Sequence, residues 1–493
     1  MYYLLEDRYL LRGWELLPYA VVDTKTGRAL FITAQEMDAL KLCNGKIDTA
    51  LPLIPKEIRD MLPRIEKNGF IRAAKPGETI SPEQEYRKYP ARYIRTAHWS
   101  VTGYCNYRCK HCYMSAPDAK YGELSHEQIM KMVQELSDCG VMNVSLTGGE
   151  PLVRRDFMEI VDALTERGIR ITQIYSNGAL VREPLLKALD GRGIHPEFNM
   201  SFDGVGWHDW LRGIPGAEEA VDRAFRLCRD IGFPTGAEMC LHQGNKHLLR
   251  ESINHLRDVG CGNLKTNPIS NVGEWKKNGC GESIPTDELF GLYLDYIPQY
   301  YEDGMPLSLM LGGFFSADPD KPDRWDIPLY HYPVDPTKCC VCNHARMVMY
   351  ISPEGRALPC MSLSGMEIQE EFPLIPELGL AKCITDSFYM DFINTRADKV
   401  LGHNPECGDC IWRSWCQGGC RAGGLDASGQ TDLLYKDPAC CEMYRNGWVG
   451  RITEVMRRIR PEASSPVLRD EKLMELAARQ REVDTPVRGQ AQA

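Results

Sequence analysis

The chain has 493 residues, and 68 acidic side chains against 58 Lys and Arg give it a net charge of −10. Its 43% apolar and 26% charged residues are typical of globular proteins and exclude disordered and collagen-like chains. Long runs of Lys and Arg are missing, so electrostatic capture of nucleic acid or of an anionic membrane is not expected. The length allows about three domains.

The sequence predicts a cytoplasmic protein, because no stretch reaches the roughly 18 apolar residues of a membrane span and no signal-peptide pattern opens it. Its 20 cysteines cannot form a disulfide framework in that compartment, where thiols are kept reduced. The alternatives are metal ligands, reactive thiols and core residues, and the clustering of most cysteines favours metal. The scattered Cys43, Cys139, Cys228 and Cys261 are expected to be core residues.

Residues 1–90 are predicted to form a small winged-helix-like α+β domain. Apolar runs at 17–22 and 28–32 flank a Lys-Thr-Gly turn and predict a hairpin. Two helices follow, indicated by a capping box (Thr33 with Glu36) and by apolar residues at helical spacing (Ile58, Leu62 and Ile65). The polar stretch 73–90 is interpreted as a linker.

Short apolar strands then alternate with amphipathic helices over residues 91–310, which predicts an α/β fold with a parallel sheet. About six repeats are expected, so the fold class is a partial (β/α)6 barrel. The strands are predicted at 96–102, 143–147, 169–175, 198–202, 237–241 and 264–267. In such folds chemistry gathers at the C-terminal ends of the strands.

Residues 311–461 are predicted to be a separate domain that is rich in Cys and Gly and short of periodic runs. Eleven of the 20 cysteines lie between 339 and 441. This composition is expected where metal replaces a hydrophobic core. Residues 462–493 are interpreted as a polar C-terminal tail with one helical stretch near 473–476.

Three cysteines, Cys105, Cys109 and Cys112, follow the first barrel strand with the spacing C-x3-C-x2-C. Three thiolates on one tight loop can hold three irons of a [4Fe–4S] cluster and leave the fourth iron open to a ligand. Zinc is the alternative, but a structural zinc site needs four ligands, and only His111 lies at a suitable spacing. The motif therefore favours a catalytic iron–sulfur centre.

Two further motifs end later strands: Gly148-Gly-Glu-Pro151 after the second and Ser201-Phe-Asp-Gly204 after the fourth. Together with the cysteine motif, and in this order, they resemble the radical S-adenosylmethionine (radical SAM) superfamily. The resemblance implies that the open iron chelates S-adenosylmethionine. An electron from the cluster would then cleave the cofactor to methionine and a 5′-deoxyadenosyl radical, which abstracts a hydrogen atom from the substrate.

The resemblance also implies which residues contact the cofactor. Each of them, taken alone, could be an ordinary loop residue, so the assignment depends on the motifs together. The implied contacts are Gly148, Gly149 and Glu150 with the methionine end, Arg212 with its carboxylate, Ser201 with the ribose, the stretch from His111 to Tyr113 with the adenine, and Asn177 at a less specific Asn-Gly turn.

A second group of cysteines has the spacing C-x2-C-x5-C-x3-C, preceded by a C-x12-G-x4-C pattern. A zinc ribbon is the alternative, and it would leave several thiols unused. The patterns resemble the SPASM extension of radical SAM enzymes, which carries two auxiliary [4Fe–4S] clusters. The resemblance implies Cys342, Cys360 and Cys420 with Cys339 or Cys340 for one cluster, and Cys407, Cys410 and Cys416 with Cys440 for the other, while the neighbouring Cys441 leaves the last choice open.

Residues 1–90 resemble the small recognition domain of enzymes that modify ribosomally synthesised peptides, in which a leader peptide adds as a strand beside the hairpin. A purely structural domain is the alternative. The whole chain thus resembles a peptide (RiPP) maturase that makes a thioether, carbon–carbon or related crosslink. The implied partners are a precursor peptide and a low-potential electron donor such as flavodoxin or ferredoxin.

Two other functions stay open. The Gly-Gly-Cys-Arg stretch that ends at Arg421 is also similar to anaerobic sulfatase maturases, which make formylglycine. In those enzymes an Asp base follows the cysteine that corresponds to Cys360, whereas Met361 stands here. A non-catalytic iron–sulfur carrier or peptide-binding scaffold is disfavoured, because it needs neither an open iron nor cofactor loops. Cys240 and Cys280 are interpreted as hydrogen donors or inert core thiols.

Overall fold

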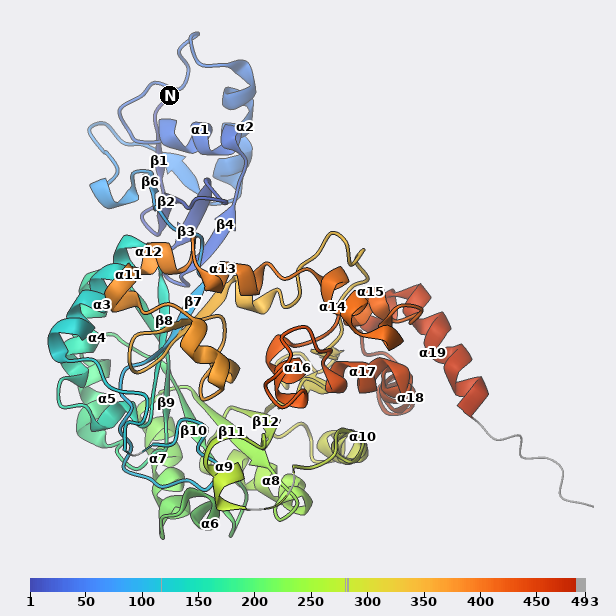
Figure 1. Cartoon of the computed structure of the whole chain (residues 1–493). Coiled ribbons are helices and arrows are strands. Elements are labelled where there is room, and N and C mark those ends of the chain that lie inside the picture. Colours follow the sequence, from blue (N-terminus) through green and yellow to red (C-terminus); the bar gives the residue numbers. More distant parts are fainter. Residues whose placement is uncertain (117, 280, 282, 485–493) are drawn as a thin grey trace, which may run out of the picture.

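Figure 1 shows an N-terminal unit above a large sheet flanked by helices, with the cysteine-rich region beside the sheet. The computed structural model describes residues 1–116, 118–279, 281 and 283–484. Cys280 and the last nine residues of the predicted tail lie outside the described residues. Along the described chain, no helix combines the length and the apolar character needed to cross a membrane.

The N-terminal unit consists of strands followed by two helices, as the sequence predicts. Its elements are β1 (Tyr3–Leu5), β2 (Tyr9–Gly13), β3 (Ala20–Asp23), β4 (Arg28–Phe31), α1 (Ala34–Leu42), α2 (Lys56–Lys67), β5 (Ile71–Ala73) and β6 (Arg87–Lys88). The predicted capping box opens α1, since Thr33 and Glu36 each accept a hydrogen bond from the other's backbone amide. Strand β3 begins at Ala20 rather than at residue 17, because the Trp14 amide closes a turn onto the Leu17 carbonyl.

Strand β4 is an open edge of the four-stranded sheet, whose order is β4-β3-β2-β6. The Ile32 amide donates to the Tyr19 carbonyl, so the antiparallel alternation turns the amides of Ala29 and Phe31 away from β3. Leu30 on this strand is 51% exposed. The edge is therefore available for pairing with another strand.

The stretch 73–90 is not a free linker, which corrects the interpretation of its polar composition. Strand β6 pairs with β2, and the Arg12 guanidinium donates to the carbonyls of Glu83 at 2.7 Å and Glu85 at 3.0 Å. Backbone groups of the stretch are thus held by β2 and its side chains. A polar segment of this kind is indistinguishable from a linker in sequence, because its bonds go to residues far along the chain.

The central unit alternates strands and helices. Its elements are β7 (Thr96–Ser100), α3 (His126–Asp138), β8 (Asn143–Thr147), α4 (Phe157–Glu166), β9 (Arg170–Ser176), α5 (Glu183–Asp190), β10 (Glu197–Ser201), α6 (His208–Arg212), α7 (Ala217–Ile231), β11 (Thr235–Leu241), α8 (Leu249–Val259), β12 (Asn263–Pro268), α9 (Gly273–Asn278), α10 (Thr286–Glu302), β13 (Ser308–Leu311), β14 (Phe315–Ala317) and β15 (Trp325–Asp326). All six predicted strands are present.

Neighbouring strands from β7 to β13 pair in parallel and in chain order, which confirms the α/β class. Alternate residues such as Trp99 and Val144 pack under the helices in the main core. The parallel sheet is wider than the six predicted repeats, because β13 extends one side and β16 (Val348–Ile351) pairs in parallel with β7 on the other. The cysteine-rich region thus contributes a strand to the barrel sheet.

The C-terminal region is more helical than its sequence predicts. Its further elements are β17 (Ala357–Leu358), α11 (Ile375–Leu378), α12 (Leu380–Cys383), α13 (Phe388–Ile393), α14 (Ala397–His403), α15 (Arg413–Cys416), α16 (Arg421–Ala427), α17 (Pro438–Arg445), α18 (Trp448–Ile459) and α19 (Glu471–Asp484). Most of these helices are shorter than the window over which a periodic pattern can be recognised. In α19, Leu473 is fully buried in the main core, so this part of the predicted polar tail is packed.

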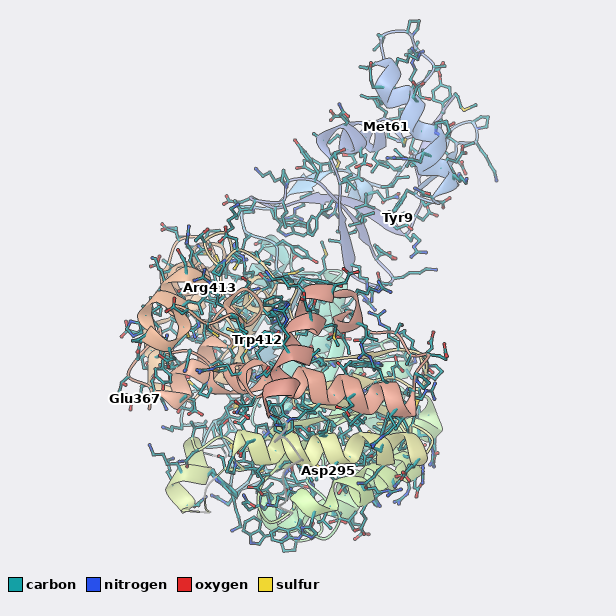
Figure 2. All side chains as sticks on the ribbon, turned by 90° about the vertical axis from the view of Figure 1, so that its right-hand side faces the viewer. Tyr9, Met61, Asp295, Glu367, Trp412 and Arg413 are labelled. Atoms are coloured by element: carbon teal, nitrogen blue, oxygen red, sulfur yellow. The ribbon has the colours of Figure 1, made fainter. Side chains whose placement is uncertain are left out.

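The N-terminal unit contacts the barrel at the edge where the parallel strands begin. The Trp14 indole donates to the Cys139 carbonyl at 3.2 Å, and the Asn143 side-chain amide donates to the Gly27 carbonyl at 3.0 Å. Asn143 is the first residue of β8. In Figure 2, Tyr9 and Met61 lie in this projecting unit, whereas Trp412 and Arg413 lie in the cysteine-rich region.

The four scattered cysteines are buried, as predicted. Cys43 and Cys228 are 0% exposed, and Cys139 and Cys261 are at most 5% exposed. Each packs in one of the hydrophobic clusters formed by the described residues. They are core residues rather than ligands.

Candidate functional site

The loop after β7 brings Cys105, Cys109 and Cys112 together. The Cys105 sulfur accepts a hydrogen bond from the Tyr107 amide at 3.4 Å, and the Cys112 amide donates to the Cys109 carbonyl at 3.2 Å. Burial, and then the charges of the neighbouring thiolates, raise the pKa of Cys105 to about 12 and that of Cys112 to about 11. Three thiolates in such a place require a positive charge beside them, which a bound iron cluster would supply.

Gly148 and Gly149 hold the cysteine loop against the end of β8. The Gly149 amide donates to the Thr102 carbonyl, and the Glu150 amide donates to the Tyr104 carbonyl, both at 2.9 Å. A β-carbon on Gly149 would lie 2.2 Å from the Tyr104 carbonyl oxygen, and one on Gly148 would lie 2.4 Å from that of Thr102. The close approach that requires these glycines is therefore to the cysteine loop itself.

We expect Gly149→Ala to displace the cysteine loop and to lower the iron bound by its three thiols. The added methyl group meets backbone, which cannot move without moving Cys105. Iron and sulfide analysis of anaerobically reconstituted protein measures the effect. Gly402→Ala in α14 is the matched control, because a β-carbon there meets nothing within 4 Å, and its iron content should equal that of the unmodified protein. Equal iron in both variants would contradict the role of Gly149.

Glu150 is a buried carboxylate next to this loop, with 0% exposure. It accepts hydrogen bonds from the Ser176 hydroxyl at 3.0 and 3.1 Å, from the Asn177 amide at 2.7 Å and from the Leu152 amide at 3.1 Å. Burial raises its pKa to about 7, against the lowering effect of these hydrogen bonds. A cationic ligand at the carboxylate would offset the cost of its charged form.

The other expected contact residues lie around the same mouth of the barrel. The Asn177 side chain donates to the Asn106 side-chain oxygen at 2.8 Å, so it supports the cysteine loop. Ser201 is the half-buried last residue of β10. The Nδ1 atom of His111 is buried and has no hydrogen-bond partner among the described residues. Tyr113 approaches Tyr350 of β16, and burial raises its pKa well above the ordinary value.

Arg212, at the end of α6, is tied to a residue that sequence reasoning did not single out. Its Nε donates to Asp203 Oδ2 at 2.7 Å, and its Nη1 lies 3.7 Å from the Cys109 sulfur. Asp203 is 0% exposed, and its Oδ1 accepts from the Cys240 amide at 3.0 Å. A sequence signal was available, because Asp203 belongs to the motif that Ser201 begins.

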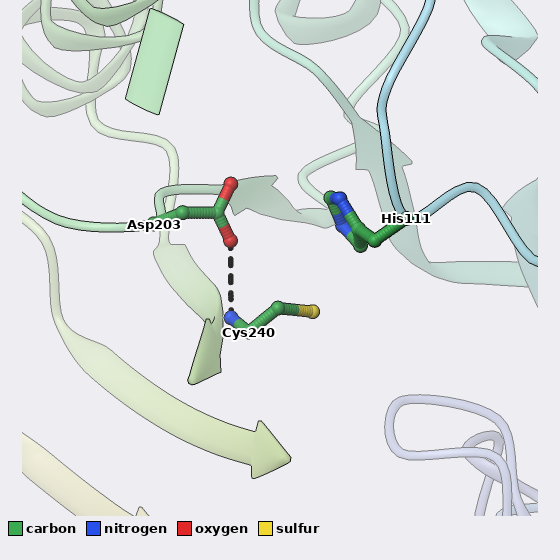
Figure 3. A group of neighbouring side chains, drawn as sticks. All are labelled: His111, Asp203 and Cys240. Carbon is green, nitrogen blue, oxygen red and sulfur yellow. Dashed lines mark hydrogen bonds between the residues drawn. The ribbon is translucent and has the colours of Figure 1, made fainter. Parts of the chain in front are cut away.

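His111, Asp203 and Cys240 face one another in Figure 3, and their potential ligand atoms lie within 4.8 Å of one another. This set is a poor cation site. Both oxygens of Asp203 already accept hydrogen bonds, and the guanidinium of Arg212 would repel a further cation. In this group the Asp203 carboxylate is held by the Cys240 amide and by Arg212, and the His111 ring lies beside them without a hydrogen bond to either.

The second group of cysteines separates into two sets. Cys342, Cys360 and Cys420 form one set, since Cys420 and Cys342 lie close enough for their charges to act on Cys360. Burial and then these two charges raise the pKa of Cys360 to about 12. The thiols of Cys339 and Cys340 bond instead to the Gln417 side chain at 3.6 Å and to the Asn394 carbonyl at 3.5 Å.

The other set of thiols lines one pocket, together with Trp412 and Lys436. It comprises Cys407, Cys410, Cys416, Cys440 and Cys441. Cys440 is 2% exposed, and its sulfur is 3.7 Å from the Cys416 carbonyl. Burial, and then the thiolates Cys410, Cys407 and Cys441, raise the pKa of Cys416 to about 12. The pocket thus offers one thiol more than a four-ligand cluster needs.

Comparison with known proteins identifies the part of the chain that carries the cysteine loop. Residues 99–256, from β7 into α8, match the radical SAM superfamily. These residues are a radical SAM domain. Such a domain uses S-adenosylmethionine and one [4Fe–4S] cluster, and the three thiols, the buried Glu150 and the buried free nitrogen of His111 fit such a pair of groups.

The similarity to several relatives extends beyond the radical SAM domain and covers most of this chain. The PqqA peptide cyclase of Granulibacter bethesdensis is 27% identical over 347 residues, which cover 69% of this chain and 85% of the cyclase. The Fe-coproporphyrin III synthase of Methanosarcina barkeri is 22% identical over 388 residues, 74% of this chain and 94% of the synthase. Streptococcus suis SuiB bound to precursor peptide SuiA superposes with a TM-score of 0.63 at 13% identity, covering 89% of this chain and 100% of SuiB, which shows a shared fold.

Proposed function

We propose that this radical SAM enzyme modifies a ribosomally synthesised precursor peptide and forms a thioether, carbon–carbon or related crosslink. The observation that carries the proposal is the combination of a radical SAM domain with an N-terminal unit that has an open strand edge. The relatives include a PqqA peptide cyclase, and SuiB has been seen with its precursor peptide. The SuiB fold covers 89% of this chain. The uncovered residues are fewer than those of the N-terminal unit, so at least part of this unit belongs to the shared fold.

The chemistry that the bound groups supply is reductive cleavage of S-adenosylmethionine to methionine and a 5′-deoxyadenosyl radical, which takes a hydrogen atom from the substrate. In this chain, Cys105, Cys109 and Cys112 would hold the cluster. Glu150 would accept from the cofactor ammonium and Arg212 would donate to its carboxylate. We assign Ser201 to the ribose, the stretch from His111 to Tyr113 to the adenine, and Asn177 to support of the loop.

We expect the affinity for S-adenosylmethionine to rise about tenfold between roughly pH 6 and pH 8 because of Glu150. Its pKa of about 7 leaves the carboxyl neutral at the lower pH, and only the ionised form accepts fully from an ammonium. Equilibrium dialysis of the reconstituted protein measures the affinity. Glu150→Gln should bind more weakly and lose this part of the pH dependence, since titration of the cofactor itself is common to both proteins. An identical pH profile in the two proteins would contradict the assignment.

We further propose two auxiliary [4Fe–4S] clusters in the C-terminal region, one on Cys342, Cys360 and Cys420, and the other in the pocket with five thiols. The burial and mutual proximity of each set support this assignment. The fourth ligand of the first set would be Cys339 or Cys340, and that of the second Cys440 or Cys441. These clusters would take up the electron left after hydrogen abstraction.

Anaerobically reconstituted protein should then contain about twelve iron and twelve sulfide per chain. We expect Cys420→Ala to lower the iron by about four and to leave the spectrum of the S-adenosylmethionine-bound cluster unchanged. Replacing Cys440 and Cys441 singly by Ser should identify the fourth ligand of the other set, because only one of the two exchanges should lower iron. Near-stoichiometric zinc in place of iron would refute the cluster assignment.

The partner of the N-terminal unit would be the leader segment of the precursor, added as a strand along β4. The outward amides of Ala29 and Phe31 and the exposed Leu30 support this edge as the docking strand. A low-potential carrier such as flavodoxin or ferredoxin would deliver the electron for cofactor cleavage.

The decisive experiment incubates the reduced enzyme with S-adenosylmethionine and the short peptides encoded near its gene. We expect 5′-deoxyadenosine and a loss of two hydrogens per crosslink by mass spectrometry. Conversion of a Ser or Cys in a sulfatase-derived peptide to formylglycine, with no change in the precursors, would instead favour the sulfatase-maturase activity. Absence of 5′-deoxyadenosine under every condition would favour an electron carrier or a peptide-binding scaffold.

A further inference from the structure

Asp203 stands at a junction of three elements beside the radical SAM cysteine loop. It follows β10, and its backbone amide lies 3.1 Å from Nδ1 of His208 on α6. Its backbone carbonyl accepts from the Asn245 side chain at 2.8 Å, in the turn that follows β11. Its two carboxylate oxygens accept from Arg212 and from the Cys240 amide. The carboxylate is therefore fixed from several directions.

The electrostatics of the pair explain why the carboxylate is tolerated in the interior. Burial alone would raise the pKa of Asp203, but the guanidinium of Arg212 and then the His208 ring lower it below its ordinary value. The pKa of Arg212 is raised in turn, because Asp203 and the Cys109 thiolate outweigh the effect of burial. Both side chains thus carry charge, and each is the strongest electrostatic partner of the other.

The geometry of the pair determines which hydrogens Arg212 offers to a ligand. Asp203 accepts a hydrogen bond from Nε at 2.7 Å, and Nε is the nitrogen that joins the guanidinium to the side-chain stem. Nη1 lies 3.7 Å from the Cys109 sulfur, on the side of the cysteine loop. A planar guanidinium held by its Nε has a fixed orientation, so its remaining donors point in fixed directions. Without Asp203, the Nε of Arg212 would lose its partner, and only the weaker contact of Nη1 with the Cys109 sulfur would orient the guanidinium.

We propose that Asp203 is a positioning residue: it holds the Arg212 guanidinium so that its free donors face Cys109 and the carboxylate of S-adenosylmethionine. This inference rests on the proposed cofactor site and is independent of the peptide substrate. Asp203 itself contacts no reacting atom. Its effect passes through Arg212, both to the cofactor and to the hydrogen bond that Arg212 gives the cluster-binding sulfur.

The test compares Asp203→Asn, Arg212→Ala and the double variant by their affinity for S-adenosylmethionine without peptide. We expect each single exchange to weaken binding about tenfold or more, with unchanged iron content. The double variant should be no weaker than Arg212→Ala alone, because residues that act as a unit are not additive. Asp222→Asn is the matched control: Asp222 is also buried beside an Arg and a His, Arg226 and His255, but on α7, and its variant should bind normally.

A second readout separates positioning from a general structural role. Loss of the hydrogen bond to Cys109 should make the midpoint potential of the cofactor-free cluster more negative in Arg212→Ala, and Asp203→Asn should shift it in the same direction. The change that S-adenosylmethionine causes in the spectrum of the reduced cluster should shrink in both. A shift in Arg212→Ala with none in Asp203→Asn, or additive losses of affinity in the double variant, would overturn the proposal.

Arg212→Lys examines the same point if Asp203→Asn does not fold. Lysine keeps the charge, but its single ammonium cannot bind Asp203 by one edge and the cofactor by another. We expect it to bind S-adenosylmethionine within about threefold of Arg212→Ala. Affinity equal to that of the unmodified protein would show that charge alone suffices and would overturn the proposal. Because none of these measurements uses a precursor, failure here is distinct from failure of the peptide-modifying function.

Discussion

Simultaneous replacement of Cys105, Cys109 and Cys112 by Ala is expected to remove about four iron per chain and to abolish 5′-deoxyadenosine formation. The three sulfurs are supplied by one loop, and the exchange removes every thiol that this loop offers. Auxiliary thiols lie in the C-terminal region and should keep their iron. Iron analysis and liquid chromatography of the reaction products measure both effects.

The matched control replaces three other cysteines, Cys139, Cys228 and Cys261, by Ala. These thiols are buried in the main core, so their loss leaves small cavities and lowers stability without touching a cluster. We expect full iron and normal cofactor cleavage from this variant at a temperature where it is folded. Cofactor cleavage by the first triple variant would show that the radical chemistry uses other thiols.

Precursor binding is expected to fall at least tenfold when Ala29→Pro is combined with Leu30→Glu on β4. Proline removes an outward amide that a docked strand would use, and glutamate replaces an exposed apolar contact with a charge. The amide of Ala29 does not pair with β3, so the sheet itself should persist. Fluorescence anisotropy of a labelled precursor measures the affinity, and mass spectrometry measures crosslinking, which should decline in parallel.

Ala34→Pro is the control for this edge. It is the same exchange only five residues away, but at the first position of α1, where proline is tolerated. Its precursor affinity should match that of the unmodified protein, and S-adenosylmethionine cleavage without peptide should be normal in both variants. Normal crosslinking by the β4 variant would mean that the leader binds elsewhere or that the N-terminal unit is structural.

Local patterns in the sequence predicted the barrel well. The strand expected at 143–147 is β8, and the capping box of α1 has the expected partners. Motifs at strand ends were correctly placed at one mouth of the barrel, because parallel strands present their C-terminal ends at the same edge of a sheet. Their roles in cofactor binding remain predictions.

Contacts between distant segments were not predictable in this way. Nothing near Val348 indicates that β16 pairs with β7, and the polar composition before Tyr89 concealed β6. The ion pair of Asp203 with Arg212 was missed for a related reason, since each residue was considered with its own motif rather than with the other. Pairing of this kind depends on where the fold brings two segments together.

The N-terminal unit lies at the start of the barrel strands. For a peptide docked on β4, this position sets a minimum length for the segment between the docked part and the residue that reacts. The cysteine loop lies at the opposite edge, and β8 alone, with five residues, separates the two edges by about 17 Å at 3.3 Å per residue. A fully extended peptide needs at least about five residues to cover that span. A longer tether reaches more easily but dilutes the reactive side chain, since effective concentration falls with tether length. The architecture therefore favours modification of peptide residues that lie within a limited number of residues of the docked segment. Peptide residues directly next to the docked segment cannot reach the cysteine loop.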